Sequence, residues 1–258
     1  MTARYTVMLW MQFRAEFLKF WRVPAFAFFS LALPLIIFAF FGLQHPTDPY
    51  APGSTITNGA FVMASMAAYT VGNVMVFSFG IGVAVERGQK QDFLMRASPL
   101  PPAIYLLAKV INALVFSTFA MIVLFVFAHF AASVSLGWLT WVTLASRLLL
   151  GSLTFIMLGF ALGYLAGPNS APAVVNVIYL PVAFGSGIFI PIQYLPDFIR
   201  WLSPYLPLSP FAQLAWSALG LKTDRSLELN LALLAGYAVA FFLLAIWAYR
   251  RDTSIKFT

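Results

Sequence analysis

The chain has 258 residues, of which 62% are hydrophobic, 17% aromatic and only 9% charged. A soluble domain carries about 25% charged residues, so this composition excludes an ordinary water-soluble fold. Five stretches lack Asp, Glu, Lys and Arg, and each reaches the roughly 20 residues that a membrane-spanning helix needs. These stretches are 23–47, 49–85, 110–146, 148–196 and 229–249. The sequence therefore predicts an all-α, multi-pass integral membrane protein with a single transmembrane domain over 1–258.

The N-terminal segment 5–22 is too charged to span a membrane but is typical of an amphipathic helix at the inner membrane surface. Gln12, Glu16 and Lys19 fall on one helical stripe, and Glu16 is spaced to pair with Lys19. The alternative is that 5–22 extends the first span into the lipid headgroups. That first span is predicted over 24–43.

The second and third spans are predicted over 59–85 and 103–127, on either side of a strongly polar segment. The polarity of this segment indicates that it lies in water. Within it, 86–100 carries the apolar trio 93–95, which a free loop has little reason to expose. A short amphipathic helix pressed into a groove on a partner protein explains the trio. The alternative, that the trio folds back onto the membrane surface, stays open on physical grounds.

The second half of the chain predicts three more spans, 148–166, 172–193 and 229–249. Trp138 and Trp141 precede the first of these and suit the headgroup level, so the segment before 148 is interpreted as a connection. Four prolines and several charges interrupt the region between spans five and six. A straight lipid-facing helix there would leave backbone amides unpaired. We expect short re-entrant or surface helices on the external side instead.

Lys and Arg concentrate in the N-terminal segment, in the polar segment before span three and at the C-terminus. Because short cytoplasmic segments carry an excess of these residues, six spans with both termini in the cytoplasm satisfy the pattern. The net charge of +7 is explained by this orientation, and nucleic-acid binding is not expected.

Catalytic patterns are weak in this sequence. His45 and His129 lie near the outer ends of spans, and no pair of acids falls inside a span, so neither a metal site nor a proton relay is predicted. A phosphate-binding loop of the Gly-x-x-x-x-Gly-Lys-Ser/Thr type is missing. We expect no enzyme activity and no bound cofactor in this chain. If ATP drives transport, another polypeptide hydrolyses it.

Two motifs in order resemble the ABC-2 type permease family. The first comprises Glu86-Arg87, Phe93-Leu94, Ala97-Ser98-Pro99-Leu100 and Lys109. The second comprises Asn176, Leu180-Pro181, Ser186-Gly187-Ile188-Phe189 and Pro191. The chain departs from the family pattern at 88–91, where members often show Glu-Arg-Glu-x-Gly-Thr, and this departure affects the contacts expected with an ATPase.

The resemblance implies a half-transporter in the bacterial cytoplasmic (inner) membrane. A second permease chain would complete a homodimer, and two copies of a cytoplasmic ABC ATPase subunit would bind ATP and Mg²⁺. The segment 86–100 would be the coupling helix, and 194–210 the short external helices. The expected ATPase-coupling residues are Glu86, Arg87, Gln89, Lys90, Asp92, Phe93, Leu94, Arg96, Ser98 and Pro99.

Five polar residues at membrane depth are candidates for the substrate path: Thr70, Asn73, Asn176, Tyr179 and Ser186. The alternative for each is ordinary interhelical hydrogen bonding. A charge at the bilayer centre costs about 2.5–3.5 kcal/mol, so spans without charges suit an amphipathic or hydrophobic cargo that is drug-, lipid- or glycolipid-like. The rival functions are a gradient-driven secondary transporter or channel and a lipid-modifying enzyme. Both call for acidic or histidine clusters that the sequence lacks.

One small-residue pattern bears on helix packing. Gly159, Gly163 and Gly167 recur every four residues, which permits close approach of another helix. That helix belongs either to the same subunit or to a second copy of the chain.

Overall fold

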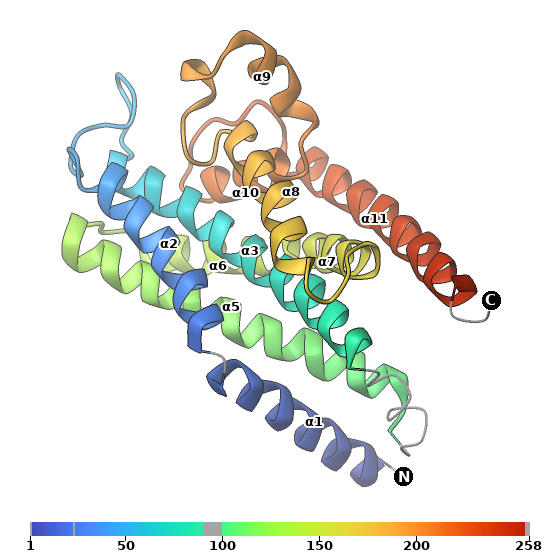
Figure 1. The fold of residues 1–258 in the computed structure, drawn as a ribbon. Coiled ribbons are helices and arrows are strands. Elements are labelled where there is room, and N and C mark those ends of the chain that lie inside the picture. The colour runs from blue at the N-terminus through green and yellow to red at the C-terminus, as the bar shows by residue number, and fades with distance from the viewer. Residues whose placement is uncertain (1, 23, 90–99, 256–258) are drawn as a thin grey trace.

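The computed structural model describes the backbone of residues 2–22, 24–89 and 100–255, and the side chains of 5–18, 31–89 and 100–251. Within these ranges the chain is helical and contains no β-strand (Figure 1). The helices are α1 (Thr2–Arg22), α2 (Pro24–Gly42), α3 (Asn58–Gly88), α5 (Pro102–Ala132), α6 (Trp138–Gly151), α7 (Leu153–Leu165), α8 (Ala171–Gly185), α9 (Asp197–Leu202), α10 (Leu208–Ala218) and α11 (Leu227–Ile255). Two short 3-10 turns, η1 (Ile192–Tyr194) and η2 (Ser203–Tyr205), flank α9.

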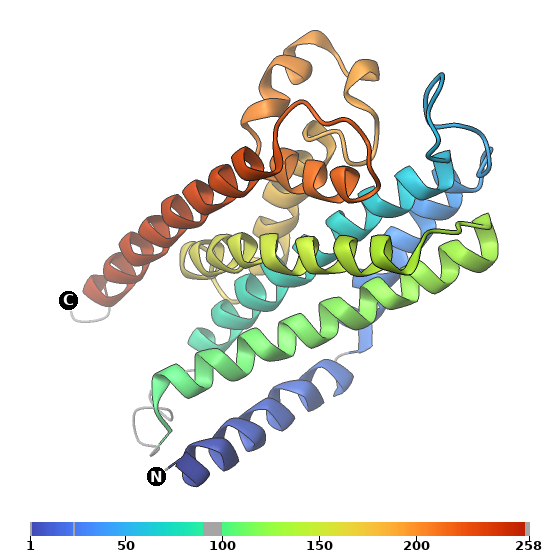
Figure 2. The ribbon, with the colours of Figure 1, turned by 180° about the vertical axis from the view of Figure 1, so that it is seen from behind.

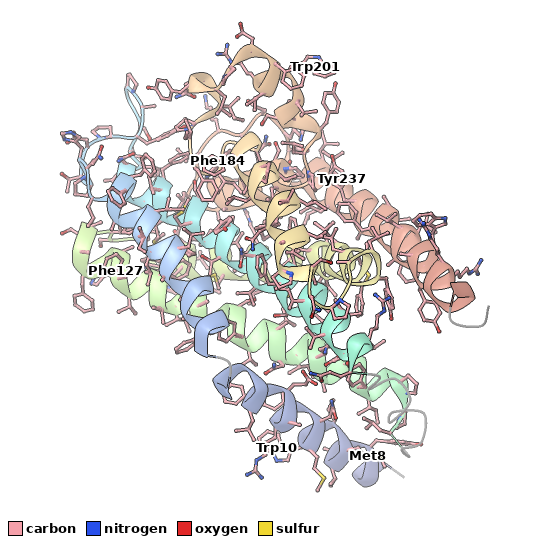
Figure 3. The ribbon with its side chains drawn as sticks, viewed as in Figure 1. Met8, Trp10, Phe127, Phe184, Trp201 and Tyr237 are labelled. Carbon is pink, nitrogen blue, oxygen red and sulfur yellow. The ribbon has the colours of Figure 1, made fainter. Side chains whose placement is uncertain are left out.

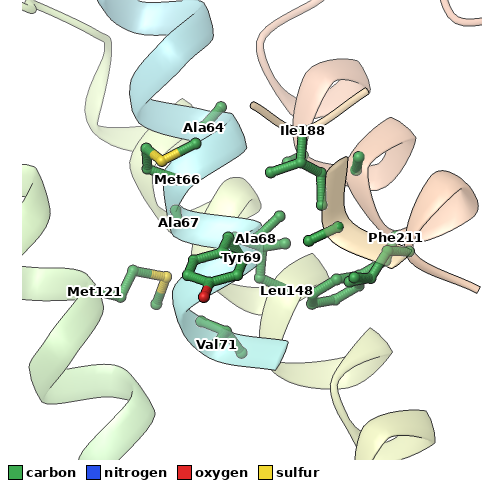
Figure 4. Close-up of a cluster of buried hydrophobic side chains, with 14 of the residues drawn as sticks. Ala64, Met66, Ala67, Ala68, Tyr69, Val71, Met121, Leu148, Ile188 and Phe211 are labelled. Carbon is green, nitrogen blue, oxygen red and sulfur yellow. The ribbon is translucent and has the colours of Figure 1, made fainter. Parts of the chain in front are cut away.

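Helix α3 occupies the centre of the bundle and contacts α2, α5, α7, α8 and α10 (Figures 1 and 2). Its side chains are buried on nearly every face from Gly59 to Val76. Small residues on α3 allow this many neighbours to approach closely. Figure 4 shows how Tyr69 of α3 lies among Met121 of α5, Leu148 of α6 and Phe211 of α10. The core is therefore organised around α3.

The outer helices present apolar side chains to the surroundings. Among them are Trp10 and Phe184, which project from the bundle in Figure 3 and are 63% and 43% exposed. Helix α11 is the least buried of the long helices and exposes Phe242, Leu243 and Trp247. Apolar surface on this scale is typical of contact with lipid or with another membrane helix.

Four helical stretches of the described chain are long and apolar enough to cross a membrane. They are α3, α5, the α6–α7 pair over Trp138–Leu165, and α11 up to Arg251. Two shorter apolar stretches, Leu31–Gly42 of α2 and α8, accompany them. The structure thus confirms an all-helical membrane protein, while the count of six spans stays a prediction.

The fourth span differs from its predicted bounds. We expected a connection at the headgroup level before 148–166, but α6 begins ten residues earlier, at Trp138. Trp141 stabilises this start by donating a hydrogen bond from Nε1 to the carbonyl oxygen of Leu136 (3.1 Å). Ser152 then separates α6 from α7, and its hydroxyl donates to the carbonyl oxygen of Leu149 (2.7 Å), a back-bond that bends helices.

The fifth span also differs, because α8 ends at Gly185, whereas the prediction continued to 193. Gly187 adopts a φ of +79°, a left-handed conformation that glycine accommodates without steric cost. A Cβ atom at Gly187 would lie 2.5 Å from Cγ1 of Ile192. The close return of the chain over Gly187 therefore ends the helix although the sequence stays apolar.

The region between spans five and six folds into the short helices α9 and α10 with their 3-10 turns, as the prolines predicted. Helix α10 is buried and contacts α3, α6 and α11. Arg147 of α6, expected at the edge of a span, donates a hydrogen bond from Nη1 to Oγ of Ser217 on α10 (2.8 Å). The two helices of this region therefore differ in burial: α9 is largely exposed, whereas α10 belongs to the core.

The glycine stripe of α7 packs against α3 of the same chain. A Cβ atom on Gly159 would lie 2.8 Å from Cβ of Phe79, and one on Gly163 would lie 2.9 Å from the carbonyl oxygen of Gly80. Gly167 lies in the turn that follows α7. Of the two alternatives left open by the sequence, packing within one subunit explains Gly159 and Gly163.

Candidate functional site

A cluster of buried charged groups joins α1, α3 and α5 at one end of the bundle. We call Glu16, Glu86, Tyr105 and Lys109 the charge cluster. The ammonium Nζ of Lys109 lies 2.6 Å from Oε1 of Glu86 and 3.8 Å from Oε2 of Glu16. The hydroxyl of Tyr105 donates to Oε2 of Glu86 and accepts from Nζ of Lys109 (3.1 Å). The side chains of Glu16 and Lys109 are each 5% exposed, and that of Glu86 is 14% exposed.

The local fold explains why these groups meet. Glu86 lies in the last turn of α3, and Tyr105 and Lys109 lie one turn apart near the start of α5. Because α3 packs on α5, these turns lie beside each other. Gly82 lies one turn before Glu86 and next to the lysine, since a Cβ atom there would be in ordinary contact with Nζ of Lys109, at 3.6 Å.

Helix α1 completes the cluster, and the sequence did not predict this contact. Glu16 was expected to pair with Lys19, whose side chain lies outside the described residues. Among the described side chains, Glu16 faces Lys109, and Nε2 of Gln12 donates to Oε1 of Glu16 (3.3 Å). The signal in the sequence was the polar stripe of Gln12 and Glu16 on an amphipathic helix. Lys109, the partner of Glu16 on α5, is 93 positions away in the sequence. Their contact depends on the packing of α1 on α5, which local spacing does not predict.

Arg87 binds the end of α7. Its Nη1 donates to the carbonyl oxygens of Gly163 (2.7 Å) and Tyr164 (3.2 Å), and its guanidinium carbon lies 5.2 Å from the ring centroid of Tyr164. The last carbonyls of a helix lack intrahelical partners and carry partial negative charge, so a guanidinium is stabilising there. Arg87 therefore ties α3 to α7 inside this chain.

Three of the ten expected coupling residues are described by the structure. Glu86 and Arg87 are bound within the bundle, as given above. Gln89 is exposed at the end of α3, where its backbone N–H donates to the carbonyl oxygen of Val85 (2.9 Å). The other seven, Lys90, Asp92, Phe93, Leu94, Arg96, Ser98 and Pro99, lie outside the described residues.

Three of the five substrate-path candidates gather around Tyr69 in the core. Oγ1 of Thr70 donates to the carbonyl oxygen of Met66 (2.7 Å), and Nδ2 of Asn73 donates to the hydroxyl of Tyr69 (3.2 Å). The hydroxyl of Tyr179 donates to the carbonyl oxygen of Tyr69 (3.1 Å). The bond of Tyr179 joins α8 to α3, as the alternative interpretation expects, whereas those of Thr70 and Asn73 lie within α3.

The other two candidates lie apart from this group. Ser186 is buried just after α8, and its Oγ donates to the carbonyl oxygen of Val182 (2.7 Å). Asn176 is exposed on α8, and its Nδ2 donates to the carbonyl oxygen of Pro172 (2.9 Å). The structure therefore does not bring all five candidates to one surface of the chain.

The comparison with known families settles the class of protein. The family described as "ABC-2 type transporter" matches residues 8–219. The chain belongs to the ABC-2 type transporter family. The matched range includes α3, α5, the charge cluster and α10. The chain is also similar to "Putative transport permease YvfS" of Bacillus subtilis (strain 168), with 27% identity over 243 residues that cover 93% of this chain and 96% of that protein.

Family membership fixes the coarse function. ABC-2 permeases are membrane-embedded transport subunits and generally pair with an ATPase subunit. This chain is thus a multi-pass transport permease, and the family indicates no catalytic activity for it.

Proposed function

We propose that the chain is the permease subunit of an ATP-driven exporter in the bacterial cytoplasmic membrane. Two copies of the permease, each with six spans and cytoplasmic termini, enclose the transport path. Two ATPase subunits bind ATP and Mg²⁺ and dock on 86–100. The cargo is amphipathic or hydrophobic and drug-, lipid- or glycolipid-like. A charged cargo would be unfavourable, because the spans carry few charges to offset the free energy of placing a charge inside the membrane.

The observation that carries the proposal is the anchoring of both ends of the segment 86–100. On its N-terminal side, Glu86 and Arg87 bind α5 and α7. On its C-terminal side, Lys109 and Tyr105 bind the same carboxylate, and Lys109 also faces Glu16 of α1. A force applied to 86–100 therefore reaches four helices through short polar contacts, and closure of the ATPase subunits supplies that force.

Co-purification tests the docking. The chain is expressed with a candidate ABC ATPase, as wild type and as Phe93→Asp and Leu94→Asp, and the ATPase retained with the permease is measured. The matched control is Phe198→Asp on α9, whose side chain is 71% exposed at the other end of the bundle. We expect Phe93→Asp and Leu94→Asp to lose the ATPase and Phe198→Asp to keep it. Equal retention by all three variants, with normal membrane insertion, would reject the assignment of 86–100.

Transport in liposomes separates this proposal from a gradient-driven transporter or channel. Liposomes that hold the permease and its ATPase are expected to move cargo only when ATP and Mg²⁺ are present. Full transport by the permease alone, without nucleotide and with an ion gradient, would favour the rival.

A further inference from the structure

An open cavity of about 380 Å³ lies at the end of the bundle opposite the charge cluster. Its volume falls within the range of about 300–1,000 Å³ that small-molecule sites have. Its lining residues come from the loop between α2 and α3, the start of α3, the segment around η1, α9, α10 and the turn before α11. The lining includes three aromatic residues, two glutamines and two residues of opposite charge: Tyr50, Phe61, Trp216, Gln193, Gln213, Lys222 and Asp224.

One wall of the cavity is a stack of three aromatic rings. The centroids of Tyr50 and Phe61 are 3.8 Å apart with planes at 21°, and those of Phe61 and Trp216 are 5.3 Å apart at 24°. Nε1 of Trp216 donates to Oγ of Ser65 (2.9 Å), and the backbone N–H of Tyr50 donates to the carbonyl oxygen of Ile56 (2.9 Å). The rings are therefore fixed in place before any ligand arrives, which reduces the entropy cost of binding.

The phenol of Tyr50 remains a neutral group. Burial raises its pKa above the ordinary value of 10.0, and the nearby Tyr194 hydroxyl raises it further. At neutral pH the aromatic wall thus carries a hydroxyl and no charge.

The charges around the cavity largely offset one another. Nη1 of Arg200 lies 3.4 Å from Oδ1 of Asp197, and its Nη2 donates to the carbonyl oxygens of Gln193 and Leu195 (3.1 Å each). Lys222 and Asp224 are two residues apart and have opposite charge. A fully anionic ligand would meet the carboxylate of Asp224 as well as the ammonium of Lys222, so the lining does not select strongly for an anion.

The remaining polar groups both donate and accept hydrogen bonds. Gln193 and Gln213 each offer a carboxamide, which has two donor hydrogens and an acceptor oxygen. The plane of Gln213 is held by Nδ2 of Asn230, which donates to its Oε1 (3.4 Å), and the side chain is buried. A purely apolar ligand would take the exposed carboxamide of Gln193 out of water without replacing its hydrogen bonds, which costs free energy.

We propose that this cavity binds an uncharged, hydroxyl-rich ring, such as the glycosyl headgroup of an amphipathic molecule. The C–H face of the ring packs against the edge of the Tyr50–Phe61–Trp216 stack. Its hydroxyls, each a donor and an acceptor, bind the carboxamides of Gln193 and Gln213 and the side chains of Lys222 and Asp224. The inference rests on the proposed function for one point, namely that the occupant is the headgroup of transported cargo at the external end of the path.

Binding by the full chain alone in lipid nanodiscs tests the cavity. The probes are octyl glucoside and octyl phosphate, which share one tail, at concentrations below micelle formation, and empty nanodiscs give the partitioning background. We expect saturable binding of octyl glucoside, about tenfold tighter than that of octyl phosphate. Equal or tighter binding of octyl phosphate, or signals that match empty nanodiscs, would overturn the inference.

Variants locate the binding. Gln193→Leu and Trp216→Leu are each expected to weaken octyl glucoside binding by about three- to tenfold, the range for one hydrogen bond or one ring contact. Gln193 is exposed, so Gln193→Leu is expected to fold normally and still tests the cavity if Trp216→Leu folds poorly. The matched control is Trp201→Leu, a 66% exposed tryptophan that does not line the cavity (Figure 3). Equal loss in Trp201→Leu, or no loss in the cavity variants, would contradict the assignment.

The two proposals fail separately. The nanodisc measurement uses neither nucleotide nor ATPase, whereas the co-purification measures neither glucoside nor cavity. A complex that forms with the ATPase while octyl glucoside fails to bind rejects the cavity alone. Saturable, cavity-dependent glucoside binding without ATPase association supports the cavity and rejects the exporter.

Discussion

Replacing Lys109 by methionine tests the energetic role of the charge cluster. The substitution keeps a long side chain but removes the ammonium that faces Glu86 at 2.6 Å and Glu16 at 3.8 Å. At an effective dielectric constant near 20, the gross attractions are about 6 and about 4 kcal/mol, and desolvation of the three groups offsets most of this. Leaving two buried carboxylates without their cation is expected to cost about 3–5 kcal/mol of unfolding free energy.

The assay is an unfolding titration in mixed micelles of a mild detergent and sodium dodecyl sulfate. It compares wild type, Lys109→Met, Glu86→Gln and the double variant, with Lys222→Met at the exposed other end as the control. We expect the double variant to lose about 1–3 kcal/mol less unfolding free energy than the two single variants lose together. The reason is that Glu86→Gln removes one of the two carboxylates that Lys109→Met leaves without a cation. Strict additivity, or a loss below about 0.5 kcal/mol in Lys109→Met, would refute the reasoning.

Three further substitutions use the same titration. Gly163→Ala is expected to cost about 1–3 kcal/mol, because its Cβ would lie 2.9 Å from the backbone oxygen of Gly80, whereas Gly236→Ala, with nothing within 4 Å, is expected to change stability by less than about 1 kcal/mol. Equal midpoints for the two would contradict the packing of α7 on α3. Tyr179→Phe removes one buried hydrogen bond and is expected to cost about 1 kcal/mol without altering transport beyond that loss. Arg87→Met, which frees two carbonyls of α7, is expected to cost about 1–3 kcal/mol, and an unchanged midpoint would argue against its role as a cap.

The long helices could be predicted because the charges along the chain mark their ends. Helix α3 ends two residues beyond Glu86, and α11 begins one residue before Glu228, as the charge-free stretches indicated. The start of α6 could not be predicted in this way. Arg147 looked like the edge of a span, yet its guanidinium is satisfied inside the bundle by Ser217, which lies 70 positions away. A partner so distant in sequence leaves no local pattern.

The candidate site was predictable in part for the same reason. The motif placed Glu86 and Lys109 at the ends of neighbouring helices, where the structure pairs them. It did not predict that Glu16 joins them, because local helical spacing offered Lys19 as a partner and the packing of α1 on α5 offered Lys109. The same limit applies to Arg87, whose acceptors are main-chain oxygens of α7. Main-chain acceptors cannot be recognised from side-chain patterns.

Helix α3 connects the two sites physically. Its C-terminal turn carries Glu86 of the charge cluster, and its first turn carries Phe61 of the aromatic wall. A continuous helix of 31 residues is about 46 Å long and resists bending, since each turn is held by its own hydrogen bonds. Gly80 lets α7 contact α3 at backbone distance. A displacement imposed on Glu86 is therefore expected to travel along α3 toward the cavity. The proposed external site thus lies where a cytoplasmic force on 86–100 is expected to arrive.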